Sequence, residues 1–136
     1  PQSRHQLWER LESLKRQGIS ILLTTHYMDE AARLCDDLVI MDHGKILAQG
    51  SPQSLISEYT GENIIEVAEP EDDLRAFSHE RKVRQEDLGH RLILYAEDGH
   101  GLYREICGRF THKSCILRSA TLEDVFLKLT GRELRE

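Results

Sequence analysis

The sequence contains little cysteine, few aromatic residues and no long apolar run, and each shortage excludes a class of protein. Its three cysteines, Cys35, Cys107 and Cys115, make no even framework, which argues against a disulfide-stapled secreted domain and favours reduced thiols. No apolar stretch approaches the ~18 residues that a transmembrane helix needs, and no cleavable signal is visible. The 136 residues, 39% of them hydrophobic, suit one globular domain or two small ones.

Acidic side chains outnumber basic ones, with 24 Asp and Glu against 18 Lys and Arg. The formal net charge is -6, and residues 62–90 hold much of the acidic excess, with nine acidic and four basic side chains. Binding to a nucleic-acid backbone needs a basic face, so no nucleic acid is expected among the partners. The acidic middle of the chain is interpreted as solvated surface.

The most informative stretch is Ile19–Ala31, where an apolar run is followed by two threonines, a histidine and a helix-forming segment. The run lacks polar/apolar alternation after Ser20, which is typical of a strand covered on both faces in a parallel sheet. His26 would then stand at the carboxyl end of a central strand, just before a helix N-terminus. Ligands bind at that edge of open α/β sheets, and helix N-termini favour phosphate groups. His26 is therefore a candidate ligand contact, although a turn residue or helix cap would leave the same pattern.

Regular elements are predicted on both sides of this histidine. An amphipathic helix that ends at Gly18 precedes it, and a helix over about residues 27–34 follows it. Two strands, 38–41 and 45–49, are predicted about a turn of sequence Asp-His-Gly-Lys. Ser51-Pro52 then begins a helix that runs to about residue 59.

A change of pattern at residues 60–62 marks the expected domain boundary, with one unit over residues 1–60 and a second over 61–136. The second unit has predicted strands near 64–67, 82–86, 91–96 and 114–118 and predicted helices near 71–78 and 101–110. The order β-α-β-β-α-β is that of a ferredoxin-like split βαβ unit. A last helix, capped by Thr121, is predicted to run to about Leu129.

Two segments carry a resemblance to a known family. The first reads Thr-Thr-His-Tyr-Met-Asp-Glu-Ala at 24–31 and continues as Cys-Asp-Asp-Leu-Val-Ile-Met-Asp-His-Gly-Lys-Ile-Leu-Ala-Gln-Gly-Ser-Pro at 35–52. It resembles the switch-histidine region of ABC-transporter ATPases, and the match runs without a gap from Pro1 to about Tyr59. The second reads Ala-Thr-Leu-Glu-Asp-Val-Phe-Leu-Lys-Leu-Thr-Gly-Arg-Glu-Leu at 120–134. It is similar to the C-terminal signature of drug- and lipooligosaccharide-exporter ATPases, nodulation-factor exporters among them.

The resemblance implies an α/β (α+β) fold. Residues 1–60 would be the C-terminal part of a P-loop ABC nucleotide-binding domain, and residues 61–136 a small ferredoxin-like βαββαβ accessory domain with a C-terminal helix. Pro1 resembles the last residue of the family's Leu-Asp-Pro loop, so the chain is expected to begin in mid-domain.

Most of the family's catalytic motifs are missing from this sequence. An ABC ATPase binds phosphate with a Gly-rich loop ending Gly-Lys-Ser/Thr, whereas the only Gly-Lys here, Gly44-Lys45, stands in the predicted hairpin turn. The Leu-Ser-Gly-Gly-Gln signature and the apolar run ending Asp-Glu are also absent. By resemblance, His26 remains as the catalytic and cofactor-binding residue, which would contact the γ-phosphate and orient the attacking water. ATP and Mg are expected as cofactors of a longer protein, and this chain alone is expected neither to bind ATP tightly nor to hydrolyse it.

The partners implied by the resemblance are an integral-membrane permease subunit and a second ATPase subunit. The intact protein would be an exporter subunit that couples ATP binding and hydrolysis to transport, and it would lie in the cytoplasm at the inner face of the cell membrane. Because an apolar strand edge pairs readily with another chain, this chain is expected to form a homodimer or a domain-swapped assembly.

The alternative function is an independent regulatory module that binds a small ligand in its second unit, for instance between Tyr95 and Tyr103. No metal site is expected, because no third ligand stands at a recognised zinc spacing from His26 and Asp29 or from Asp42 and His43.

Overall fold

The structure is a computed structural model that describes residues 2–110 and 114–131. Pro1 and the last residues of the exporter-like tail, 132–134, lie outside the described residues. The helices are α1 (Gln2–Arg16), α2 (Met28–Leu34), α3 (Pro52–Tyr59), α4 (Asp72–Glu80), α5 (Gly99–Arg109) and α6 (Leu122–Thr130). The strands are β1 (Leu38–Asp42), β2 (Lys45–Gly50), β3 (Asn63–Ala68), β4 (Arg84–Asp87), β5 (Arg91–Tyr95) and β6 (Ser114–Ser119). None of the helices in this described part is both long and apolar enough to span a membrane.

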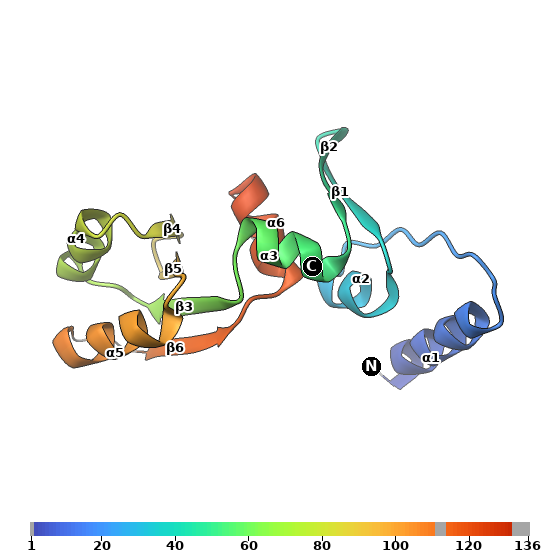
Figure 1. Ribbon diagram of the computed structural model, residues 1–136, viewed down its shortest axis with the longest axis horizontal. Helices are drawn as coiled ribbons and strands as arrows, with labels where there is room; N and C mark the ends of the chain where they lie inside the picture. Colours follow the sequence, from blue (N-terminus) through green and yellow to red (C-terminus); the bar gives the residue numbers. More distant parts are fainter. Residues whose placement is uncertain (1, 111–113, 132–136) are drawn as a thin grey trace.

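The elements lie in a row along the long axis of the molecule (Figure 1). α1 stands at one end, and α2 with the β1–β2 hairpin comes next. α3 and α6 occupy the middle, and the sheet of β3 to β6 with α4 and α5 forms the other end. The mixed α/β class predicted from the sequence is confirmed.

The strand predicted over Ile19–Thr25 is wrong, because these residues form no regular structure. Leu22 is 98% exposed and Ile19 is 48% exposed, so the run is not covered on both faces. A strand needs a neighbour that pairs with its N–H and C=O groups, and no strand of the described residues pairs with this run. Residues 19–25 have the composition of a buried strand, but neither sheet of the described residues includes them.

The predicted hairpin is confirmed. β1 and β2 pair antiparallel, with Ile40 opposite Ala48 and Asp42 opposite Lys45. His43 and Gly44 make the turn with φ of 49° and 75°, the left-handed conformation that two-residue hairpin turns require. Ile40 and Ala48 are buried on the inner side, which faces the helices of the first half of the chain.

The four strands of the second half form an antiparallel sheet of order β4-β5-β3-β6. The order is the one in which a split βαβ unit places its strands, so the predicted β-α-β-β-α-β arrangement is confirmed. α4 and α5 cover one face of the sheet, where the apolar side chains of Ile65, Val67, Leu92 and Leu94 meet Leu74, Phe77 and Ile106. These seven residues are the main core of this half.

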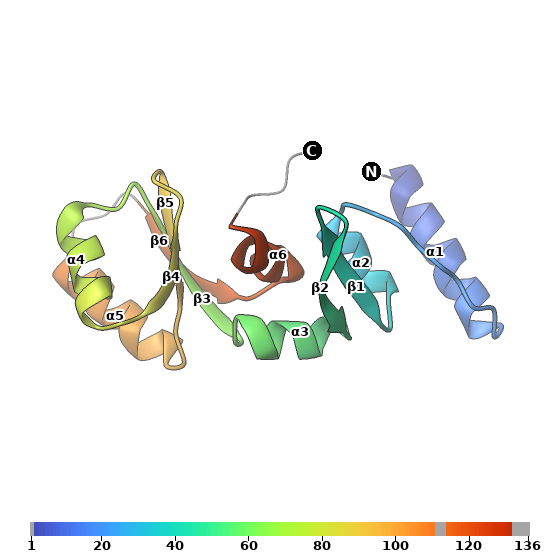
Figure 2. The ribbon, with the colours of Figure 1, turned by 90° about the horizontal axis from the view of Figure 1, so that it is seen from above.

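α6 lies between the uncovered face of this sheet and the helices of the first half (Figure 2). On the side toward the sheet, Leu127 packs with Ile64, Ile93 and Tyr95. On its other side, Leu122 and Val125 enter a second cluster with Ala31, Ile40, Ala48 and Leu55. Lys128 Nζ also donates a hydrogen bond to the Tyr59 carbonyl at the end of α3. The last helix therefore contributes to the packing of both halves, and the division at residue 60 stays a prediction.

The start of α6 is fixed by a buried carboxylate. Asp124 is 4% exposed and accepts hydrogen bonds from the Thr121 N–H at 2.8 Å and the Thr121 hydroxyl at 3.1 Å, which completes a capping box. Arg118 at the end of β6 donates to both Asp124 carboxylate oxygens, each at 2.8 Å. The same guanidinium lies 3.6 Å from Glu66 on β3. A bidentate, charge-assisted pair thus joins the helix to the sheet.

The packing of α6 predicts how the chain responds to truncation of its apolar side chains. Leu122→Ala should lower the free energy of unfolding by about 2–5 kcal/mol, because it leaves a cavity where a side chain only 1% exposed has packed. Leu22→Ala, measured at a protein concentration low enough to keep the chain monomeric, is the matched control, and its effect should stay within about 0.5 kcal/mol because that side chain is 98% exposed. Urea unfolding followed by circular dichroism measures both. Equal losses would contradict the assignment of α6 to the core.

Candidate functional site

His26 lies at the end of the irregular segment and two residues before the start of α2. Its side chain is exposed, and its imidazole contacts the ring of Tyr27 with 4.2 Å between centroids. The Tyr27 N–H donates to the Thr25 hydroxyl at 3.0 Å, which fixes the backbone on either side of the histidine. The predicted place before a helix is correct, whereas the predicted place at the end of a paired strand is not.

α2 is held against α1 at both of its ends. Near its start, Trp8 Nε1 donates to Glu30 at 2.8 Å and Arg4 donates to Asp29 at 3.1 Å. At its end, Lys15 Nζ donates to the Leu34 carbonyl at 2.8 Å. Trp8 is the buried residue of α1, at 6% exposure. These contacts place the turn that carries His26 at a fixed distance from the first helix.

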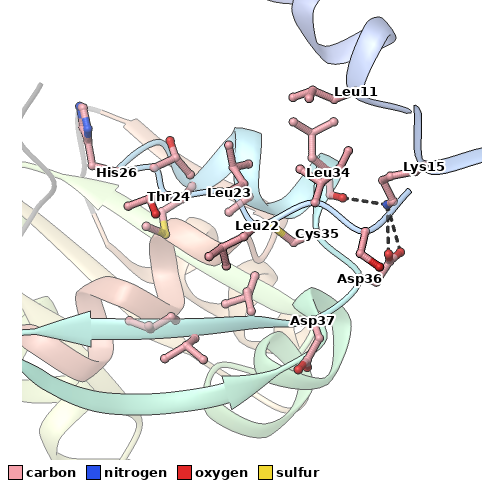
Figure 3. A pocket seen from close by; sticks show the side chains of 18 of the residues that line it. Leu11, Lys15, Leu22, Leu23, Thr24, His26, Leu34, Cys35, Asp36 and Asp37 are labelled. Atoms are coloured by element: carbon pink, nitrogen blue, oxygen red, sulfur yellow. Dashed lines mark hydrogen bonds and ion pairs between the residues drawn. The ribbon is translucent and has the colours of Figure 1, made fainter. Parts of the chain in front are cut away.

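A cleft of about 880 Å³ opens between the irregular segment, α2 and β1. Most of its lining is apolar and includes Leu11, Leu23, Leu34, Ile40 and Phe126. His26 stands at one end, and Lys15 with Asp36 stands at the other, 3.2 Å apart (Figure 3). The lining offers few polar groups that could grip a charged ligand.

Cys35 lies in the same cleft, beside the end of α2. Burial raises the pKa of its thiol, the Lys15 ammonium lowers it in part, and the Asp36 carboxylate raises it further. The side chain also packs against the apolar cluster of α2 and α6. Its chemistry is that of a core thiol with a reduced thiolate fraction.

The structure separates the other residues that the sequence singles out. Gly44-Lys45 is a hairpin turn, as predicted, and not a phosphate loop. Tyr95 and Tyr103 lie on opposite faces of the sheet, Tyr95 with Leu127 of α6 and Tyr103 with the core under α5, so they do not line one pocket. His43 Nδ1 lies 3.9 Å from Asp42 on the exposed turn.

Comparisons with known proteins indicate which class of protein this chain is similar to. Residues 68–131 match the family described as nodulation factor export protein NodI, C-terminal domain. The match lies in the second half of the chain and includes residues 120–131 of the tail that carries part of the resemblance. Together with the relatives below, it confirms that the chain resembles the ATP-binding subunits of ABC exporters.

Individual relatives carry the name Nod factor export ATP-binding protein I. The relative from Burkholderia lata is 42% identical over 141 residues, the one from Mesorhizobium japonicum 42% over 138, and the one from Ralstonia nicotianae 44% over 142. Each alignment covers 100% of this chain but only 45%, 40% and 44% of the relative, respectively. The chain therefore spans less than half the length of these curated relatives and is similar to their C-terminal part.

Sequence reasoning assigned no role to Arg4 or Trp8, which the structure brings next to the turn that carries His26. The sequence does show a basic and an aromatic residue one helical turn apart, at positions 4 and 8 of α1, and such a pair lies on one face of a helix. What they would contact depends on the angle at which α1 crosses α2, and no local pattern specifies that angle.

The burial of Cys35 predicts selective alkylation. At pH 8 iodoacetamide should modify Cys35 more slowly than the exposed Cys107, because a raised pKa leaves less thiolate and the cleft limits access. Peptide mass spectrometry of a time course measures both rates in one sample. Reaction of Cys35 as fast as that of Cys107 would mean that the cleft is open enough to solvate the thiol.

Proposed function

We propose that this chain is the part of an ABC-exporter ATP-binding subunit that carries the switch histidine and the accessory unit. The observation that supports this most is the 42–44% identity to Nod factor export ATP-binding proteins over alignments that cover the whole chain. In the intact subunit, binding and hydrolysis of ATP would be coupled to transport across a membrane.

His26 would act at the γ-phosphate of ATP. An imidazole can donate a hydrogen bond to a phosphate oxygen near physiological pH, and its exposed place before α2 leaves it accessible to a ligand. Its action needs groups that this sequence lacks, a Gly-rich phosphate loop and a carboxylate pair for Mg. ATP and Mg would therefore bind when the chain is joined to such a region, and the chain alone would be inactive.

The partners would be a permease in the membrane and a second ATP-binding subunit. The subunit would work from the cytoplasm, at the inner face of the cell membrane, where ATP is available. The relatives' names give Nod factor as their exported molecule, which makes a lipooligosaccharide the first class of substrate to test.

Calorimetric titration with Mg-ATP tests this function. The chain alone should give no measurable heat, whereas a version joined to the upstream region of one of the relatives should bind and hydrolyse ATP. His26→Ala in the joined version should lower kcat by about 100-fold or more, because a group that stabilises transition-state charge is lost. Tight binding to the chain alone, or full activity of the His26→Ala variant, would refute the assignment.

Exposed apolar side chains suggest that copies of the chain associate. Leu22 is 98% exposed, and Met41 and Ile46 on the hairpin are 58% and 64% exposed. Met41 lies opposite Ile46 in the hairpin, and Met41 and Leu22 both line the cleft, so we call these three residues the apolar patch. Exposed apolar side chains that lie together mark an interaction site. We therefore keep a homodimer or domain-swapped assembly as the proposed state.

Static light scattering tests this association. The chain should elute as a dimer at high concentration, and Leu22→Lys should shift it toward the monomer because a charge would enter the contact. Gln53→Lys, on the exposed side of α3, adds the same charge away from the patch and should leave the dimer intact. A monodisperse monomer for the unchanged chain would contradict the proposal.

A further inference from the structure

Five side chains from α1, α2 and the turn before α2 form a continuous stack, which we call the His26 stack. In order they are His26, Tyr27, Arg4, Trp8 and Arg33. The His26 and Tyr27 rings lie 4.2 Å apart with 34° between their planes. Arg4 Cζ lies 4.4 Å from the Tyr27 centroid and 5.0 Å from the Trp8 centroid, and Arg33 Cζ lies 5.1 Å from the Trp8 centroid.

Arg4 is the member that joins the two aromatic rings. Its guanidinium contacts Tyr27 on one side of the junction and Trp8 on the other. Arg4 Nη2 donates a hydrogen bond to Asp29 at 3.1 Å, which orients the guanidinium from α2, while Glu30 lies 3.8 Å from Nε as an ion pair without a hydrogen bond. A planar, delocalised cation can stack on a ring and keep its ion pairs, whereas a lysine ammonium is a point charge on a flexible stem.

The far end of the stack is anchored in the helix pair. Trp8 is 6% exposed and donates from Nε1 to Glu30 at 2.8 Å. Arg33 is itself paired to Glu12 at 3.0 Å. His26, by contrast, follows an irregular exposed segment, and the Tyr27 ring is the side chain that the structure places against its imidazole. The order of the imidazole therefore depends on the order of Tyr27.

We infer that Arg4 is a positioning residue for His26, acting through the ring of Tyr27. By linking the Tyr27 ring to the buried Trp8 through its guanidinium, Arg4 limits the orientations of the neighbouring imidazole before any ligand binds. The inference rests on the proposed function for what His26 contacts, but the stack itself is a property of this chain. It gives α1 a role in the site that the resemblance does not assign to any of its residues.

Nuclear magnetic resonance of the histidine side chains tests the positioning directly in this chain. The His26 ring signals are identified by their loss in His26→Ala, and their displacement by the Tyr27 ring current and their cross-peaks to Tyr27 report the contact. Arg4→Lys keeps the positive charge but removes the planar group, so we expect the cross-peaks to be lost and the His26 shifts to move toward those of a free histidine. Arg10→Lys makes the same change at an exposed position of the same helix and should change neither.

A second variant covers the case in which Arg4→Lys separates α1 from α2, which a red shift of the Trp8 emission would reveal. Asp29→Asn removes the shorter ion pair of Arg4 and leaves the Trp8 to Glu30 hydrogen bond in place. Weaker cross-peaks between His26 and Tyr27 in Asp29→Asn, with unchanged Trp8 emission, would support the inference. Unchanged His26 signals in Arg4→Lys, or in Asp29→Asn where Arg4→Lys undocks the helix, would overturn it.

The ATPase assay of the joined version separates this inference from the proposed function. If both hold, Arg4→Lys lowers kcat by about 10- to 100-fold and leaves KM close to its original value, because a misplaced group costs rate more than binding. If His26→Ala leaves the ATPase rate unchanged, the proposed function fails while the resonance experiment still decides whether Arg4 orders His26. If His26→Ala abolishes the rate and Arg4→Lys leaves both the rate and the ring signals unchanged, the positioning role is refuted alone.

Discussion

The structure depends above all on the two-sided packing of α6. Its Leu122 and Val125 complete an apolar cluster with α2, α3 and the hairpin, while its Leu127 covers part of the four-stranded sheet. The buried Asp124, held by Arg118 from β6 and by the cap at Thr121, fixes where the helix begins. Because one side of this helix serves each half of the molecule, both the apolar cluster of the first half and the second face of the sheet are incomplete without it.

Local chemistry explains why much of the fold could be predicted from the sequence. The hairpin follows from Gly44 between two apolar runs, and Ser51-Pro52 marks the start of α3 through a cap and a first-turn proline. The sheet order could be predicted because the β-α-β-β-α-β sequence of elements permits few arrangements. The run over Ile19–Thr25 could not be judged in the same way, because a strand exists only where another strand pairs with it, and composition does not say whether that partner is present.

The candidate site also has one part that could be predicted from the sequence and one part that could not. His26 could be found from its neighbours in sequence, since Thr-Thr-His followed by a helix-forming segment is a local pattern. Its support could not, because Arg4 and Trp8 reach Tyr27 only after α1 has docked on α2 across a connection of more than ten residues. The cleft beside the histidine is lined mostly by apolar side chains from the irregular segment, α2 and β1. Under the proposed function, the remaining groups for phosphate would come from a region joined to this chain.

The position of α6 in the chain sets the order in which the protein can fold. Leu55 of α3 and Leu122 of α6 share a buried cluster, and Tyr59 and Lys128, 69 residues apart, share a hydrogen bond. During synthesis, the cluster that α2, the hairpin and α3 share with α6 can be completed only after the whole four-stranded sheet has left the ribosome. The sheet can form meanwhile, since its core under α4 and α5 needs no residue of α6. The second half of the sequence is therefore the part that becomes stable first. Its helix α6 then completes the apolar cluster of the first half.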